Sequence, residues 1–269
     1  FVEKMKPGDI FVLGARTYAF IKVRGNRIIV RDATGLKPTI PSWSGEMLPR
    51  SYDLGVLIGK FRKEVQGMLD NDTEARKWLE ENYRVDKNGS RSILSYIRSQ
   101  EKFGLPTDDF LLIEGNVEKG LYSALFLVPL GRRVNDALSR AYALAISTKF
   151  GINTRITVTD DGFMLTYEQK IDLKQIVTMI NSENFEEMVR KSVSNTEIFK
   201  QRFRHCASRS MMVLRRYKGH EISVVRQQLR SEKVLRALQE IPGFPVITET
   251  FREIMNDMMD VPMALKYVG

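Results

Sequence analysis

Residues 195–217 read NTEIFKQRFRHCASRSMMVLRRY, and the rest of the chain can be placed around this segment. On a helix with about 100° per residue, its apolar side chains gather into one stripe. The stripe consists of Phe199, Phe203, Cys206, Ala207, Val213 and Leu214. One flank carries cations spaced seven apart, namely Arg202, Arg209 and Arg216, and the other flank carries Lys200, Arg204 and Arg215. The pattern predicts a single helix over residues 196–216, anchored in a core and lined with guanidinium groups on both sides.

The charge balance around this segment favours an external anion. Between residues 197 and 233, ten Lys or Arg residues face three Asp or Glu residues. Too few carboxylates are nearby to neutralise these cations, so a polyanion is the natural partner. The alternative is a solvated, salt-bridged helix, because charge runs are usually solvent faces.

Composition and length describe an ordinary globular chain. Its 269 residues are 43% hydrophobic and 28% charged, which suits one large or two modest domains. No apolar run approaches the roughly 18 residues that cross a bilayer, and no signal peptide is visible, so no membrane partner is expected. A single cysteine, Cys206, excludes an internal disulfide and indicates a reducing, cytoplasmic location. With only His205 and His220 beside it, no zinc site is expected.

The net charge of +9 and the isoelectric point near 9.6 favour nucleic acid or another anionic partner. The chain begins at Phe1 without an initiator methionine, so we expect it to be a fragment of a longer protein.

Residues 1–46 are expected to form a small β-barrel-like module. Runs rich in β-branched and aromatic residues predict strands at 10–13, 18–23 and 28–31. A loop with three prolines follows over residues 38–49 and holds Trp43 in its middle. An indole on a stiff loop is suited to stack on a base. The alternative is a tryptophan that folds back onto the core.

The remaining chain is expected to hold a helical segment at 47–103 and an α+β region at 104–269. The first has helices near 51–68, 72–83 and 90–100. In the second we expect strands at 110–114 and 121–128, a helix at 131–150, a hairpin over 153–167, and helices near 172–180, 184–193, 196–216, 221–239 and 245–258. The predicted fold class is therefore α+β: a small β-barrel-like module, then helices, then a mixed βαββ-plus-helical-bundle region.

Catalytic motifs are missing from the sequence. The phosphate-binding pattern G-x-x-x-x-G-K-[S/T] does not occur, and Gly59-Lys60 lies inside a predicted helix. No G-x-S-x-G, H-E-x-x-H or catalytic Cys–His motif is present either. We therefore expect no catalytic activity, cofactor or metal in this chain alone.

Acidic residues are given structural roles. The pairs Asp108-Asp109 and Asp160-Asp161 are interpreted as turn formers, with a metal role as the alternative. Four acids near the end of the chain predict a face that docks on the arginine helix or on another domain. They are Glu249, Glu253, Asp257 and Asp260.

A second candidate anion site is the helix start at Arg132 and Arg133. Cations there meet the positive end of the helix dipole, at a cost of about 0.3–1 kcal/mol each. A phosphate on the free N–H groups would turn this cost into a gain. The alternative is that both arginines reach nearby carboxylates such as Asp136.

Several short motifs stand in order along the chain: PSWSGE at 41–46, LGVLIGKF at 54–61, PLGRRV at 129–134, AYALA at 141–145, DDG at 160–162, FRHCASR at 203–209, FP at 244–245 and ETFRE at 249–253. Together they resemble the Lhr (large helicase-related) family over residues 8–260. The differences at residues 47–50 and Lys60 are closer to an archaeal branch than to the bacterial proteins.

The resemblance implies an ATP-dependent superfamily-2 helicase that moves 3′-to-5′ on single-stranded DNA, unwinds DNA or RNA:DNA duplexes and serves DNA repair. It also implies two RecA-like domains and a winged helix of the same polypeptide as partners, with ATP and Mg²⁺ bound by those motor domains.

We therefore expect a nucleic-acid-binding accessory region that grips the translocated strand. The expected contact residues are Trp43, Arg132, Arg133, Lys200, Arg202, Arg204, Arg209, Arg215 and Arg216. The alternative is a protein–protein docking module with an arginine-rich face. A stand-alone enzyme is disfavoured by the missing catalytic sets.

Overall fold

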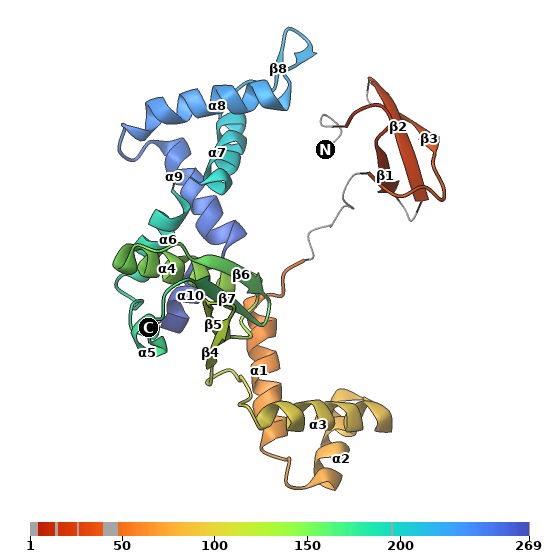
Figure 1. Ribbon diagram of the computed structural model, residues 1–269, viewed down its shortest axis with the longest axis vertical. Coiled ribbons are helices and arrows are strands. Elements are labelled where there is room, and N and C mark those ends of the chain that lie inside the picture. The colour runs from red at the N-terminus through yellow and green to blue at the C-terminus, as the bar shows by residue number, and fades with distance from the viewer. Residues whose placement is uncertain (1–4, 14–15, 26, 40–47, 195, 269) are drawn as a thin grey trace. The chain divides into compact units, whose positions relative to one another are not determined.

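The computed structural model describes residues 5–13, 16–25, 27–39, 48–194 and 196–268. The chain divides into two units, Phe1–Leu48 and Pro49–Gly269, and each is described by itself (Figure 1). Helices and antiparallel sheets are both present, which confirms the predicted α+β class. None of the helices within the described ranges is long and apolar enough to cross a bilayer.

The first unit is built on a three-stranded antiparallel meander. Its strands are β1 (Ile10–Leu13), β2 (Arg16–Arg24) and β3 (Arg27–Asp32), in the order β1-β2-β3. The predicted strands are confirmed, but the barrel-like prediction is wrong for the described residues. A sheet of three strands has two edges and cannot close on itself. Its small interior consists of Ala19, Phe20 and Ala33.

The second unit begins with three amphipathic helices. They are α1 (Tyr52–Gln66), α2 (Asp72–Tyr83) and α3 (Lys87–Glu101). Each has a side-chain cap: the side chains of Ser51, Asn71 and Asp86 accept N–H bonds from the first turns. They share an apolar cluster of Val65, Leu69, Ala75, Leu79, Leu94, Ile97 and Leu105.

Two glycines let α1 approach the rest of the second unit closely. A Cβ on Gly55 would lie 2.2 Å from the carbonyl oxygen of Pro129, and one on Gly59 would lie 2.5 Å from the backbone nitrogen of Asp108. Both glycines are therefore needed for packing, which explains the LGVLIGKF motif without any phosphate-binding role.

The core of the second unit is a four-stranded sheet covered by one long helix. The strands are β4 (Leu112–Glu118), β5 (Leu121–Leu127), β6 (Arg155–Thr159) and β7 (Gly162–Tyr167), in the order β4-β5-β7-β6. Helix α4 (Arg132–Phe150) connects β5 to β6 and packs on β6 and β7. This is the predicted βαββ arrangement.

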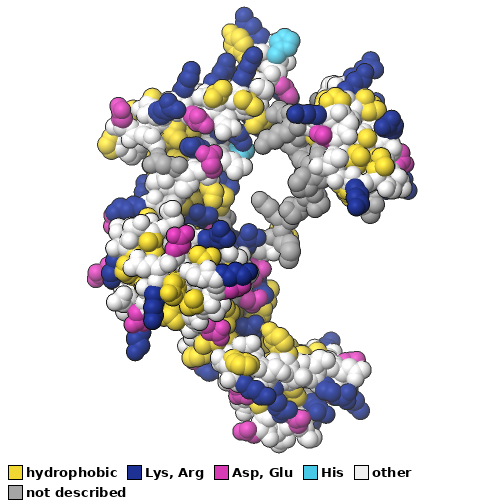
Figure 2. Space-filling model, in the orientation of Figure 1, with side chains coloured by type: hydrophobic (Ala, Val, Ile, Leu, Met, Phe, Trp, Pro, Cys, Tyr) yellow, Lys and Arg dark blue, Asp and Glu magenta, His cyan; other side chains and the backbone are white. Residues whose placement is uncertain are grey.

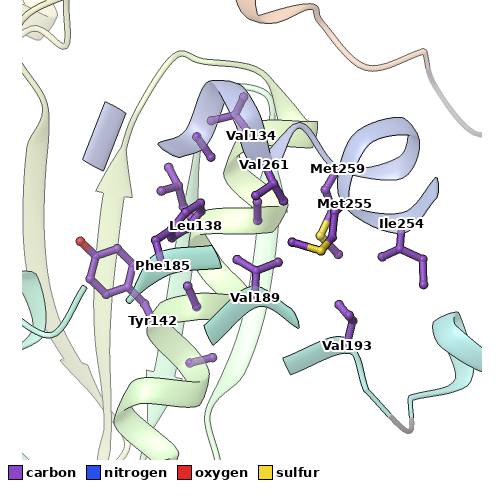
Figure 3. Close-up of a cluster of buried hydrophobic side chains, with 14 of the residues drawn as sticks. Val134, Leu138, Tyr142, Phe185, Val189, Val193, Ile254, Met255, Met259 and Val261 are labelled. Atoms are coloured by element: carbon purple, nitrogen blue, oxygen red, sulfur yellow. The ribbon is translucent and has the colours of Figure 1, made fainter. Parts of the chain in front are cut away.

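The rest of the second unit is mainly helical. Its elements are α5 (Leu173–Val177), α6 (Phe185–Val193), α7 (Glu197–Arg209), β8 (Arg216–Tyr217), β9 (His220–Glu221), α8 (Val224–Gln239), α9 (Pro245–Arg252), the π-helix η2 (Glu253–Met258) and α10 (Val261–Val268). In Figure 3, Leu138 and Tyr142 of α4 lie beside Phe185 of α6, and Val261 of α10 joins the same core.

Two features of this part differ from the prediction. The helix expected over 196–216 ends at Arg209 and is followed by the β8–β9 hairpin. The chain also forms α10, for which no helix is predicted.

Candidate nucleic-acid interface

Helix α7 is fixed in the core as its apolar stripe predicts. The Thr196 hydroxyl accepts a hydrogen bond from the Phe199 N–H at 3.3 Å and starts the helix. The side chains of Phe199, Phe203, Cys206 and Ala207 are all buried. The Phe199 ring packs on Phe251 of α9 with centroids 4.7 Å apart. The polar sides of α7 are thereby held in a defined orientation.

The helix ends early because the backbone turns at Met211. This residue has a φ of 60°, and the Met212 N–H donates back to the Ala207 carbonyl at 2.9 Å. Val213 is still buried, but from the loop rather than from the helix. Consequently Arg216 is not on the same helix flank as Arg202 and Arg209, and this part of the prediction is wrong.

Arg202 and Arg209 share one buried carboxylate. Arg202 Nη1 lies 3.3 Å from Glu253 Oε2, and Arg209 Nη2 donates to Glu253 Oε1. The Glu253 side chain is 4% exposed, whereas that of Arg209 is 61% exposed. The contact raises the pKa of Arg209. The prediction that the acidic face docks on the arginine helix is confirmed at Glu253, and these two arginines have an internal counter-charge.

The remaining cations of α7 differ from one another. Lys200 Nζ pairs with Glu197 Oε1 at 2.7 Å. Arg204 is half-buried and has no ion pair with any residue that the structure describes. Of the α7 cations, Arg204 is therefore the one whose charge is not paired with a described carboxylate.

The pKa of His205 is affected by burial and by the positive charges of this cluster. Its pKa is lowered by partial burial and then by the positive charges of Arg204, Arg202, Arg209 and Arg215. A carboxylate-rich surrounding would have the opposite effect. The surface at His205 is therefore electropositive.

The β8–β9 hairpin extends this surface and was missed in the sequence. Arg215 precedes it and is exposed without an ion pair in the described part of the chain, and Arg216 pairs with Glu221 at 2.8 Å in full solvent. Tyr217 is 58% exposed, and Lys218 Nζ lies 5.5 Å from its ring centroid. The signal available was the Lys218-Gly219 pair, which turns with positive φ values of 48° and 81°.

Helix α8 adds further cations beside the hairpin. Figure 2 shows Lys and Arg side chains gathered over α8 and β8, among hydrophobic ones. Four of these cations are exposed and form no ion pair with a described residue: Arg226, Arg230, Lys233 and Arg236. We define the basic end as the partly or fully exposed cations of 204–236 other than Arg209, which pairs with Glu253; it consists of Arg204, Arg215, Arg216, Lys218, Arg226, Arg230, Lys233 and Arg236.

The start of α4 is organised differently from the prediction. Asp160 Oδ1 accepts from the N–H groups of Arg132 and Arg50, each at 2.9 Å. The N–H group proposed for a phosphate therefore already has a carboxylate partner. Arg133 Nη2 donates to the carbonyl oxygens of Met259, at 3.2 Å, and Asn256.

The alternative for these arginines is also wrong among the described residues, because neither side chain pairs with a carboxylate. Asp136 pairs with Arg140 at 2.9 Å, and Arg133 instead binds the C-terminal carbonyls of η2, where a cation is favourable. The Arg132 side chain is exposed, without an ion pair within the described ranges.

The two aspartate pairs do more than form turns. Asp160 and Asp161 make the β6–β7 turn as predicted, and Asp161 also pairs with Arg50 at 2.7 Å and with Arg62 at 3.6 Å. The Arg50 contact lowers the pKa of Asp161. Asp109 likewise binds Lys63 of α1. These contacts tie α1 to the sheet.

Trp43, the expected stacking residue, lies outside the described residues. The predicted site is thus brought together only in part: Lys200, Arg202, Arg204 and Arg209 lie on α7, Arg215 and Arg216 lie at the hairpin, and Arg132 and Arg133 belong to the α4 start.

Comparison with known proteins gives consistent matches. The DEAD/H associated family matches residues 105–269. The ATP-dependent helicase Lhr-Core protein 2 of Thermococcus barophilus is 45% identical over 268 residues, which cover 98% of this chain and 31% of that protein. The Lhr-Core helicase of Saccharolobus solfataricus is 43% identical over 97% of this chain and 31% of its own length. The chain thus spans about a third of these relatives.

A solved structure of Mycobacterium smegmatis helicase Lhr, bound to ssDNA and AMP-PNP, has the same fold. The TM-score is 0.70 at 24% identity, and the match covers 87% of this chain and 30% of that one. The Lhr helicase/uracil glycosylase of Escherichia coli is 29% identical over 97% of this chain and 17% of its length. Identity is therefore higher to the Lhr-Core proteins.

Proposed function

Since the chain belongs to the DEAD/H associated family and is a helicase-associated region of the Lhr type, we propose that it grips the single strand along which a helicase motor moves. The observation that carries this proposal is the basic end of the second unit. All of its cations except the half-buried Arg204 are exposed, and most have no carboxylate partner among the described residues. Phosphates of a nucleic-acid strand would supply the missing negative charge.

The structure favours a different set of gripping residues from the one predicted. Arg202 and Arg209 are held by Glu253, so they orient α7 and add positive field. Direct phosphate contacts are assigned to Arg204, Arg215 and the exposed cations of α8. Arginine suits this role because its planar fork binds two phosphate oxygens at once.

The remaining parts of the proposal concern the whole helicase. Translocation 3′-to-5′, unwinding of DNA or RNA:DNA duplexes, a role in DNA repair and base stacking by Trp43 are proposals that rest on the family. ATP and Mg²⁺ are assigned to RecA-like domains. The residues of this chain do not fit them, because its one Gly-Lys pair is Gly59-Lys60 in α1, where Gly59 packs against the backbone of Asp108.

A second candidate function is protein docking at the same end of the molecule. Met211 is 80% exposed and Val225 62% exposed, so apolar side chains accompany the cations. Such a mixed surface also suits an acidic protein with apolar side chains.

The test removes three cations of the basic end by changing Arg204, Arg215 and Arg230 to Gln. We expect weaker binding of all single-stranded oligonucleotides and a log–log salt dependence flatter by up to about 2, at roughly 0.7 per lost phosphate contact. The matched control changes Arg91, Lys102 and Lys170, exposed cations without ion pairs in the described part, to Gln.

Both variants have the same net charge, so a difference in strand binding between them depends on where the cations were lost and not on their number. Equal salt slopes for the two folded variants would refute the grip at the basic end. Unchanged strand binding together with lost binding of an acidic protein would support the docking function instead.

A further inference from the structure

On one face of the β2–β3 hairpin in the first unit, every charged side chain is a cation. Opposed residues of an antiparallel pair project to the same side, and neighbours along a strand alternate. Arg24 opposes Arg27, and Lys22 opposes Ile29. Arg31 follows Ile29 by two residues and shares its side. Lys22, Arg24, Arg27 and Arg31 therefore form one surface, which we call the hairpin cationic face.

No carboxylate of the described residues neutralises this face. Asp32 opposes Tyr18 and lies next to Arg31, so it projects to the other side. Its Oδ1 is bound by the N–H and hydroxyl of Thr34, at 2.8 and 2.6 Å. Asp9, the other described acid of this unit, accepts from the Lys6 N–H at 2.7 Å.

The arrangement of the cations is unfavourable without an external anion. All four are exposed, and none has an ion pair with a described residue. Arg24 and Arg27 are direct cross-strand partners, and like charges in that position destabilise a hairpin. A bound phosphate would remove this repulsion.

We propose that the hairpin cationic face binds the phosphate backbone of single-stranded nucleic acid. This is a contact separate from the basic end, and it lies in the other unit of the chain. The expected recognition is by charge and takes no account of base sequence, because guanidinium and ammonium groups meet phosphates rather than base edges.

The dimensions of the face fit one row of phosphates. Adjacent β-strands lie about 4.8 Å apart, and alternate residues along a strand lie about 7 Å apart. The face is thus two β-strands wide, and the duplex in the experiment below tests whether the row of phosphates must belong to a free strand.

Two contacts in two units make the binding bivalent. A strand long enough to reach both contacts is held twice, and the second contact forms at a raised effective concentration. This part rests on the proposed function of the basic end, whereas strand binding by the hairpin does not.

The experiment uses the full chain with Lys22, Arg24 and Arg27 changed to Gln. The control changes Lys6, Arg16 and Lys37 to Gln and removes the same charge from the same unit. Binding is measured against thymidine oligonucleotides of about 6 and about 30 nucleotides, against a duplex of the longer length, and against poly-glutamate. The variants at the basic end are measured in parallel.

We expect the hairpin variant to flatten the salt dependence on the long strand by up to about 2. It should also lower the affinity for the long strand roughly tenfold more than that for the short strand. The control should change neither. The Arg24→Gln variant alone, which relieves the repulsion, should melt no lower than the parent and still weaken binding.

Three outcomes would overturn the proposal. If the hairpin variant and its control weaken strand binding equally, binding depends on the net charge of the unit and not on this face. An effect seen on the duplex alone would exclude the single strand as ligand. An effect on poly-glutamate alone would identify an acidic protein. In each case a loss in the basic-end variant would leave the proposed function standing.

Discussion

The chain contains two arginine doublets, Arg132-Arg133 and Arg215-Arg216, and the structure uses them in opposite ways. At the start of α4, Arg133 binds the carbonyl oxygens of Met259 and Asn256, and the Arg132 backbone is held by Asp160. At the β8–β9 hairpin, Arg215 is exposed without an ion pair in the described part, and Arg216 has only a solvated pair.

This difference shows that partners, rather than charge density, separate a structural arginine from a binding one. A guanidinium aimed at helix C-terminal carbonyls stabilises the fold. A guanidinium in solvent without a counter-ion contributes little to stability and is available to a ligand.

The largest expected effect separates the two members of the first doublet. Arg133→Met should lower the free energy of unfolding by about 1–3 kcal/mol, because it removes a charged donor from two carbonyls. Arg132→Met should change it by less than about 0.5 kcal/mol, because that side chain is exposed. Urea unfolding of both variants measures this. Equal destabilisation would show that the Arg133 contacts are not the stabilising element.

A smaller effect concerns the pair of Arg50 and Asp161 near the same helix start. The pKa of Asp161 is lowered in the folded state, chiefly by its hydrogen bond from Arg50. Its contribution to stability is therefore present above the unfolded pKa, about 3.8, and is lost as pH falls through the folded value.

Because half of the Asp161 side chain is exposed, we expect no more than about 1 kcal/mol. Thermal melting from neutral to acid pH should show Asp161→Asn less stable at neutral pH, with the two curves converging below pH 4. A constant difference at all pH values would mean that the charge of Asp161 is not what matters.

The smallest effect is a change in the pKa of His205. Partial burial, and then the positive charges of the nearby arginines, hold this pKa below its usual value, 6.5. Phosphates of a bound strand would offset those charges and raise the pKa. Linkage then requires strand affinity to increase as pH falls through the pKa of His205 in the complex, because the complex binds protons more readily.

NMR titration of the chain, which contains two histidines, measures this shift with and without oligonucleotide. A His205 pKa that stays constant when a strand is bound would place the grip away from α7.

Local patterns predicted the elements, but few of the partners of their charges. The stripe of Phe199 and Phe203 correctly placed α7 in the core. The end of that helix was missed because Met211, which has no glycine-like freedom, adopts a left-handed backbone. Periodicity continues through such a turn, since Val213 is still buried.

Long-range contacts explain the other errors. Arg133 and Asn256 are 123 residues apart, and Arg209 and Glu253 are 44 apart. Local patterns predicted that the acidic face with Glu253 docks on the arginine helix, but not that Glu253 pairs with Arg202 and Arg209 or that Arg133 meets Asn256. The charge count at 197–233 therefore overstated the free positive charge, because Glu253 lies outside that window.

The burial of Cys206 also has a practical consequence. Its side chain is 4% exposed, and its sulfur accepts a hydrogen bond from Arg209 Nη2 at 3.2 Å. A thiol enclosed in this way reacts slowly with maleimides. Cysteines introduced at the exposed positions Lys37 and Gln228 can thus be labelled with a fluorophore pair in the otherwise native chain. Energy transfer between the dyes then gives the separation of the two units directly, in solution, before and after a strand is added.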